Sequence, residues 1–190
     1  VVTSSATSTI KNVNNNPTGS VVISGTTTED ATISIDTSAL ADGDGLGALR
    51  YQWQRSLDGT NYNDIKSATL STYALDDPDV GNSVRVAISY LDQQGTQERV
   101  YSNALTSITA VNDDPVGSIT VSGALSQGRS ISANVNNLSD ADGLGTLKYQ
   151  WMRSSDNSTF TSISAATEPN YELTHRDVDQ YIKVKISYKD

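Results

Sequence analysis

The sequence predicts an all-β protein built from two β-sandwiches in tandem. Its 190 residues correspond to one or two domains of ordinary size. Short stretches of alternating apolar and polar residues, separated by Gly, Asp and Asn turn signals, dominate the chain, and helical periodicity is weak. Hydrophobic residues make up 36% of the chain, with one Phe and one Met, which suits thin cores between two sheets.

An internal repeat divides the chain. Residues 17–92 match residues 115–190 without a gap, at an offset of about 98 residues. Both copies carry the sequences Gly-Leu-Gly and Tyr-Gln-Trp, the latter at Tyr51–Trp53 and Tyr149–Trp151. We therefore expect residues 14–111 to form the first repeat and residues 112–190 a second repeat that lacks its own last strand. Residues 1–13 match residues 99–111 at the same offset, which predicts that they are the last strand of a preceding repeat.

Seven short strands are expected in the first repeat, enough for a two-sheet sandwich. Leu49, Tyr51 and Trp53 alternate along one of them and are expected to face the core. Because the chain has no cysteine, we expect the tryptophan to pack on aliphatic side chains such as Ile33 and Val86 alone. The predicted strands are residues 21–24, 31–35, 49–55, a strand beginning at 62–65, 72–75, 84–90 and 100–108.

The tryptophan on the third predicted strand is followed by Tyr73-x-Leu75-x-x-x-Asp79-x-Gly81 and by an alternating strand. This order of residues resembles the immunoglobulin-like pattern, which implies Greek-key sandwiches. Two departures are the missing cysteine pair and the corner tyrosine, which is Ser83 in the first repeat but Tyr181 in the second.

A closer resemblance is carried by the second repeat, which reads DDPVGSITVSG…ADGLGTLKYQW…DVDQYIKVKISYKD. This sequence is similar to the bacterial immunoglobulin-like, cadherin-like tandem repeats of large secreted RTX-type adhesins and biofilm surface proteins. The resemblance covers nearly the whole chain. It implies an extracellular location at the bacterial surface, long arrays of repeats, and calcium bound within or between domains.

Composition and charge exclude several classes of function. A net charge of −9 and a pI near 4.4 argue against nucleic acid and against an anionic membrane surface. No apolar stretch approaches the roughly 18 residues of a membrane span, so we expect no membrane insertion. The carboxylate pair Asp42 and Asp44 could in principle serve a glycosidase, but it lies in a turn, recurs in both copies and implies no cleft. We therefore expect that the protein is not an enzyme.

Acidic loops are the candidate metal site. Sandwich topology places the loops at the two ends of each domain. Because the repeats follow one another along the chain, we expect the acidic loops at the end of the first repeat to meet those at the start of the second at residues 112–115. Carboxylate and amide oxygens suit Ca²⁺ better than zinc or copper. The Asp-x-Asp-Gly sequences at Asp42–Gly45 and Asp140–Gly143 resemble the start of an EF-hand loop. They are not EF-hands, because the twelfth position of that loop, which needs a bidentate Glu, is Trp53 or Trp151. The predicted ligands are Asp76, Asp77, Asp79, Asn112, Asp113, Asp114, Asp140, Asp142 and Asp190, with Asp42, Asp44 and Asp92 in the first repeat.

Two interpretations of this acidity stay open: a calcium ion that stiffens the junction, or ordinary solvated loops rich in Asp and Gly. For function, we expect structural spacer repeats of an extracellular bacterial adhesin or surface filament, whose partners are neighbouring repeats of the same polypeptide. One alternative is a glycan- or protein-binding immunoglobulin-like module. Another is a filament of identical subunits joined head-to-tail by strand donation between residues 1–13 and the open edge of the second repeat.

Overall fold

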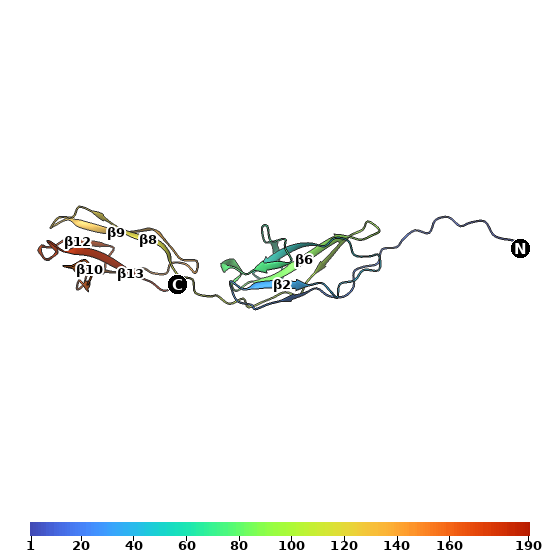
Figure 1. The fold of residues 1–190 in the computed structure, drawn as a ribbon, viewed down its shortest axis with the longest axis horizontal. Coiled ribbons are helices and arrows are strands. Elements are labelled where there is room, and N and C mark those ends of the chain that lie inside the picture. The colour runs from blue at the N-terminus through green and yellow to red at the C-terminus, as the bar shows by residue number, and fades with distance from the viewer. The chain divides into compact units, whose positions relative to one another are not determined.

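The computed structural model describes all of residues 1–190 and is all-β, as the alternation predicts (Figure 1). The chain divides into two compact units, unit 1 at Val1–Val111 and unit 2 at Asn112–Asp190. Its helical segments are two short 3₁₀ turns, η1 (Asp77–Asp79) and η2 (His175–Asp177). Neither has the length or the apolar character needed to cross a bilayer.

Unit 1 contains two antiparallel sheets that enclose one core. The first sheet has the order β1 (Val22–Ser24), β2 (Thr32–Asp36), β5 (Thr72–Ala74). The second has the order β4 (Asn63–Asp64), β3 (Arg50–Ser56), β6 (Ser83–Leu91), β7 (Gln97–Tyr101). Period-two alternation brings the apolar side chains of β2, β3 and β6 onto the inner faces.

Unit 2 repeats this architecture with a smaller buried core of Ile131, Trp151 and Leu173. One sheet has the order β12 (Asn170–Glu172), β9 (Ser130–Ser139), β8 (Val116–Gly123). The other has the order β11 (Thr161–Ser162), β10 (Lys148–Ser154), β13 (Tyr181–Ser187), so β13 is an outermost strand.

The tryptophan environment differs from the prediction. Trp53 is fully buried, but it stacks on Tyr73 with ring centroids 5.5 Å apart, so its neighbours are not aliphatic alone. Its indole N–H donates to the Leu70 carbonyl at 3.0 Å. Trp151 and Tyr171 repeat the stack at 5.7 Å. The tryptophan of each unit therefore has an aromatic neighbour as well as the aliphatic residues of its core.

The second difference between prediction and structure is the last strand of unit 1. Five of the predicted strands agree with β1, β2, β3, β5 and β6 to within one residue at each end. The strand predicted at 100–108 instead ends at Tyr101, because the Ser102 hydroxyl accepts the Val86 N–H at 3.0 Å in place of a backbone carbonyl. The pairing of this segment with β6 then shifts by one residue, and Leu105 pairs with Val84. The segment then crosses the sandwich edge, and Thr109 pairs in parallel with Thr28.

Candidate functional site

The first aspartate of each Asp-x-Asp loop holds the loop to the end of a core strand. Asp42 Oδ1 accepts the Asp44 N–H at 2.8 Å, and Asp42 Oδ2 accepts the hydroxyl of Tyr90 on β6 at 2.7 Å. Burial and this hydrogen bond raise the pKa of Tyr90 above its ordinary value. Both oxygens of Asp42 are therefore used by the fold.

Unit 2 repeats this arrangement. Asp140 Oδ1 accepts the Asp142 N–H at 3.1 Å, and the Tyr188 hydroxyl donates to Asp140 Oδ2. The hydrogen bond to Asp140 raises the pKa of Tyr188 to about 12. The first aspartate of the motif therefore has the same structural role in both units.

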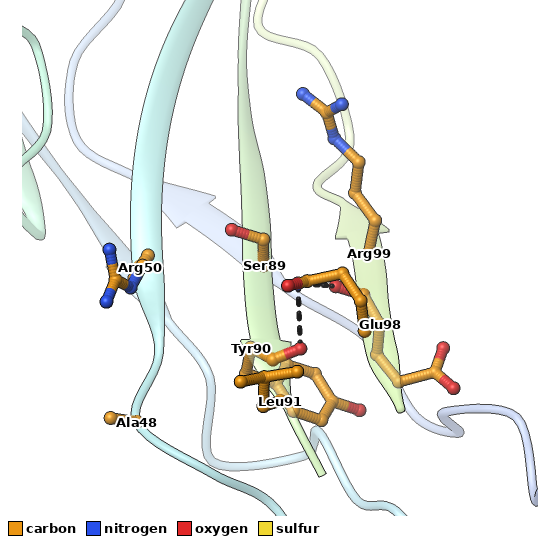
Figure 2. Close-up of a pocket in the computed structure, with 8 residues that line it drawn as sticks. Ala48, Arg50, Ser89, Tyr90, Leu91, Glu98 and Arg99 are labelled. Atoms are coloured by element: carbon orange, nitrogen blue, oxygen red, sulfur yellow. Dashed lines mark hydrogen bonds between the residues drawn. The ribbon is translucent and has the colours of Figure 1, made fainter. Parts of the chain in front are cut away.

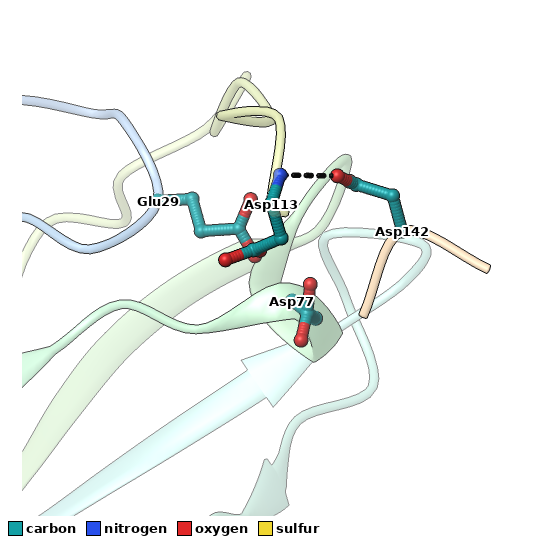
Figure 3. Close-up of side chains that lie close together, drawn as sticks. All are labelled: Glu29, Asp77, Asp113 and Asp142. Atoms are coloured by element: carbon teal, nitrogen blue, oxygen red, sulfur yellow. Dashed lines mark hydrogen bonds between the residues drawn. The ribbon is translucent and has the colours of Figure 1, made fainter. Parts of the chain in front are cut away.

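The second aspartate of each loop binds the segment through which the chain enters the unit. Asp44 Oδ2 accepts the backbone N–H of Asn15 at 2.6 Å, and this bond lowers the pKa of Asp44. Asp142 Oδ2 accepts the backbone N–H of Asp113 at 2.8 Å (Figure 3). We call this contact the entry bond, Asn15–Asp44 in unit 1 and Asp113–Asp142 in unit 2. Its recurrence shows that each unit fixes its own entry segment in the same way.

The Gly-Leu-Gly sequence that follows each loop is explained by packing. A Cβ on Gly47 would lie 1.9 Å from the Leu91 carbonyl oxygen, and one on Gly145 would lie 1.8 Å from that of Lys189. Leu46 packs against the core of unit 1. The glycines are therefore required by close backbone approach, independently of any ligand.

Some buried carboxylate oxygens accept no hydrogen bond. Asp92 is only 5% exposed, and its Oδ1 accepts the backbone N–H groups of Gln94 and Thr96 at 2.8 and 2.7 Å. Asp92 Oδ2 is buried without a hydrogen-bond partner. An unpartnered buried carboxylate oxygen is costly, and a bound cation would compensate it.

In unit 2 the residue equivalent to Asp92 is Asp190. Asp140, Asp142 and Asp190 each place a carboxylate oxygen within 4.8 Å of the others. With one oxygen from each of the three carboxylates, the cluster supplies fewer than the six to eight oxygens that Ca²⁺ takes, so backbone carbonyls and water would have to complete the shell.

A second acidic pair lies where the chain leaves unit 1. Glu29 is 3% exposed; its Oε2 accepts the Val111 N–H at 3.0 Å, and its Oε1 is buried without a partner. Asp77, on η1, offers an oxygen within 4.8 Å of a Glu29 oxygen (Figure 3). Glu29 is not among the ligands predicted from the sequence, because no local pattern indicates that its side chain is buried.

Asp79 is a predicted ligand that the structure places elsewhere. It is fully buried, its Oδ1 accepts from Arg55 Nε at 2.6 Å, and its Oδ2 accepts from the Tyr73 hydroxyl at 2.8 Å and the Asp76 N–H at 3.0 Å. Asp79 therefore holds η1 against the sandwich, and both of its oxygens accept hydrogen bonds within unit 1.

The remaining predicted ligands lie near the ends of the units. Asp76 accepts the Asp77 N–H at 3.2 Å and caps η1. The Asn112 amide donates to the Asp113 carbonyl at 3.0 Å, and Asp114 is exposed. Asp114 is not part of the Asp140–Asp142–Asp190 cluster.

A hollow of about 680 Å³ lies over the ends of β3, β6 and β7 (Figure 2). Arg50 and Arg99 flank Ser89 as cross-strand neighbours in this hollow. Glu98 also lines it, but its Oε1 accepts from the Asn14 amide at 2.8 Å. The guanidinium groups make this hollow unsuitable for a cation.

Two small all-β units, each with an acidic loop that binds its own entry segment, define a tandem-repeat protein. A family model described as "Domain of unknown function (DUF8696)" matches residues 14–111 and 117–189, so the chain belongs to the DUF8696 family. No curated protein matches the chain.

Proposed function

We propose that the two units are immunoglobulin-like spacer repeats of an extracellular bacterial adhesin or surface filament. The observation that carries the proposal is the entry bond, Asn15–Asp44 in one unit and Asp113–Asp142 in the other. The strand orders β1-β2-β5 and β4-β3-β6-β7 support the immunoglobulin-like topology, in which the third strand pairs with the sixth. The resemblance to adhesin repeats supports the location.

The entry bond suits a spacer because it limits the freedom of the segment between consecutive domains. A hydrogen bond from a backbone N–H to an ionised carboxylate is stronger than one between neutral groups. Pro17 and Pro115 follow soon after the bonded residues and restrict the residues before them to extended backbone. Together these features hold the entry segment in one conformation against its domain.

Calcium is the ion we propose for the acidic ends. The support is the buried, unpartnered Oδ2 of Asp92 and Oε1 of Glu29, and the carboxylate cluster of Asp140, Asp142 and Asp190. Hard oxygen donors without nitrogen or sulfur favour Ca²⁺ over transition metals. At the end of unit 1 the Val111 N–H donates to Glu29, and at the start of unit 2 the Asp113 N–H donates to Asp142, so each unit has its own acidic residue beside the connecting segment.

Aromatic side chains do not favour the alternative of a glycan-binding module. Trp53 and Trp151 are fully buried. The Arg85 guanidinium lies 3.8 Å from the ring centroid of Tyr62 and 4.2 Å from that of Tyr101. A sugar-stacking platform needs an uncovered ring face, and Arg85 already stacks on these two rings.

Thermal unfolding with EDTA, and again after adding excess CaCl₂ or MgCl₂, tests the calcium part. We expect EDTA to lower the melting temperature and Ca²⁺ to restore it more effectively than Mg²⁺. Asp92→Asn and Glu29→Gln should reduce the response, whereas Asp58→Asn, in an exposed turn, should keep it. An unchanged melting temperature, with no calcium detected by native mass spectrometry, would rule out calcium.

The spacer part is tested separately by small-angle scattering of the intact chain. We expect the distribution of distances to broaden in Asp142→Ala, which breaks the entry bond of unit 2, and to stay unchanged in Asp156→Ala, in a distant loop of the same unit. Equal distributions for both variants and the unmodified protein would show that the entry bond does not restrict the segment.

A further inference from the structure

The outer face of the four-stranded sheet in unit 1 carries positive charge on an otherwise acidic domain. Arg50 on β3, Arg85 on β6 and Arg99 on β7 point outward, because each alternates along its strand with side chains of the core. Asp64, on β4, is the one carboxylate at an outward position of these strands. Acidic residues outnumber basic ones in unit 1 as a whole, so this face differs in charge from the rest of the domain.

Two of these arginines lie on either side of Ser89, in the hollow of about 680 Å³ over β3, β6 and β7 (Figure 2). Arg50 is the cross-strand neighbour of Ser89 on one side and Arg99 on the other. Their Cα atoms are therefore two strand spacings apart, about 10 Å, and a ligand above Ser89 is within reach of both guanidinium groups. Every residue that lines the hollow lies between Ala48 and Arg99, so unit 1 builds it alone.

Neither of the two guanidinium groups is neutralised by a carboxylate. Arg50 and Arg99 are exposed, and both ion pairs of the protein involve other arginines. Glu98 lines the hollow, but it is only 8% exposed and its Oε1 accepts from the Asn14 amide at 2.8 Å. An arginine binds a carboxylate through two parallel hydrogen bonds, and a serine hydroxyl donates one more. The hollow therefore has the donors that an anionic oxygen ligand needs.

Arg85 adds charge to this face but is held in place by its neighbours. Its Nε donates to Gln54 Oε1 at 2.9 Å, and its guanidinium stacks on two tyrosine rings. In the second repeat, Lys148 and Lys183 stand at the positions of Arg50 and Arg85. Positive charge at these two positions therefore recurs in the sequence, as the acidic loops do.

The place of the hollow in the sheet favours a polysaccharide as its ligand. An extended peptide gains affinity by pairing its main chain with an open strand edge, whereas the backbone groups under this hollow are already paired between β3, β6 and β7. A nucleic acid or a flat anionic membrane would also meet the acidic loops at the ends of the domain. A thin chain that carries carboxylates avoids these loops, and recognition by charge needs no uncovered aromatic ring.

We propose that the hollow over β3, β6 and β7 binds the carboxylate groups of an acidic polysaccharide through Arg50, Arg99 and Ser89. The two guanidinium groups pair with carboxylates, and the Ser89 hydroxyl donates to a carboxylate or a sugar oxygen. The contacts are few and open to solvent, so one hollow binds a short oligosaccharide weakly, with a Kd on the order of 1 mM. This inference goes beyond the proposed spacer function and does not require it.

Titration of the intact ¹⁵N-labelled chain with tetragalacturonate, followed by NMR, tests the proposal. EDTA is present throughout, so that no calcium ion links the oligosaccharide to the acidic loops. We expect the amide signals of Arg50, Ser89 and Arg99 to shift, and the affinity to fall as NaCl is added. Maltotetraose, a neutral oligosaccharide of the same length, should shift none of them.

Charge-matched variants separate this hollow from the general charge of the protein. Arg50→Gln and Arg99→Gln should each weaken the binding of tetragalacturonate by at least about fivefold. Lys66→Gln removes the same charge at an exposed position outside the hollow and should leave the Kd within about twofold. Arg99→Lys keeps the charge but not the planar fork, so its Kd should lie between those of Arg99→Gln and the unmodified protein. The NMR spectrum of each variant shows directly whether it is folded.

Three results would overturn the proposal. The first is no shift at about ten times the expected Kd, or shifts confined to the acidic loops. The second is equal weakening by Lys66→Gln and Arg99→Gln, which would show attraction by net charge alone. The third is a tetraglutamate peptide that binds as tightly as tetragalacturonate and shifts the same signals, which would make an acidic peptide the ligand.

Discussion

Arg55 Nε donates to Asp79 Oδ1 across 2.6 Å, and the Asp79 side chain is completely buried while Arg55 is partly exposed. The pair recurs in unit 2 as Arg153 and Asp177, with an Nε–Oδ1 distance of 2.6 Å. In both units a tyrosine hydroxyl, from Tyr73 or Tyr171, donates to the second carboxylate oxygen at 2.8 Å. The network connects the third strand, the fifth strand and the 3₁₀ turn of each sandwich.

We expect Asp79→Ala to destabilise unit 1 by about 3 kcal/mol, because it leaves the Arg55 guanidinium without its buried partner. Urea unfolding followed by tryptophan fluorescence would measure the loss. Lys66→Ala, at an exposed position, is the control and should change the free energy of unfolding by less than about 0.5 kcal/mol. A loss below about 1 kcal/mol in Asp79→Ala would show that the ion pair contributes no more than a surface pair.

Gly47→Ala should destabilise unit 1 by about 2 kcal/mol, because the new Cβ would lie 1.9 Å from the Leu91 carbonyl oxygen and force the backbone apart. Gly43→Ala, four residues earlier, meets its nearest atom, Asn15 Cβ, at 3.2 Å and should cost less. Thermal unfolding of both variants measures the difference. If the two substitutions cost the same, the Gly-Leu-Gly sequence is not explained by this close approach.

The stability contributed by Asp156 should depend on pH in the acid range. Hydrogen bonds from the Ser154 hydroxyl and the Thr159 and Ser158 N–H groups lower the pKa of Asp156 to about 2 from an ordinary value of 3.8. A carboxylate whose pKa falls on folding stabilises the protein above pH 3.8, and this contribution is lost as the pH falls to about 2. The difference in stability between Asp156→Asn and the unmodified protein should therefore shrink over this range. A difference that stays constant from pH 6 to pH 2 would contradict the shift.

The strands were predictable because alternation is local. Residues 84–90 alternate between the two faces, and β6 runs from Ser83 to Leu91. The end of β7 was not predictable, because it depends on the Ser102 hydroxyl replacing a backbone acceptor for Val86 on another strand. A side chain that substitutes for the backbone leaves no periodic signal.

The Asp-x-Asp loops show the same limit for the site. Their recurrence is visible in the sequence, but their role depends on partners far along the chain. Asp42 binds the hydroxyl of Tyr90, and Asp44 binds the N–H of Asn15. Likewise the burial of Glu29 follows from its contact with Val111, which no local pattern indicates. The sequence pattern locates the acidic residues. The hydrogen bonds of the folded chain are needed to distinguish carboxylates that hold the fold together from those with unpartnered oxygens.

The entry bond of unit 2 should be visible in hydrogen exchange of the Asp113 amide. In the unmodified protein this N–H donates to Asp142 Oδ2 at 2.8 Å, so exchange requires the bond to open. We expect Asp142→Ala to accelerate exchange at Asp113 by at least about tenfold, whereas Asp142→Asn, which keeps a side-chain oxygen acceptor, should preserve part of the protection. Asp156→Ala is the control in the same unit and should leave the Asp113 amide unchanged. If Asp113 exchanges at the rate of an unprotected amide in the unmodified protein, the entry segment is not fixed in solution and the spacer proposal loses the observation that carries it.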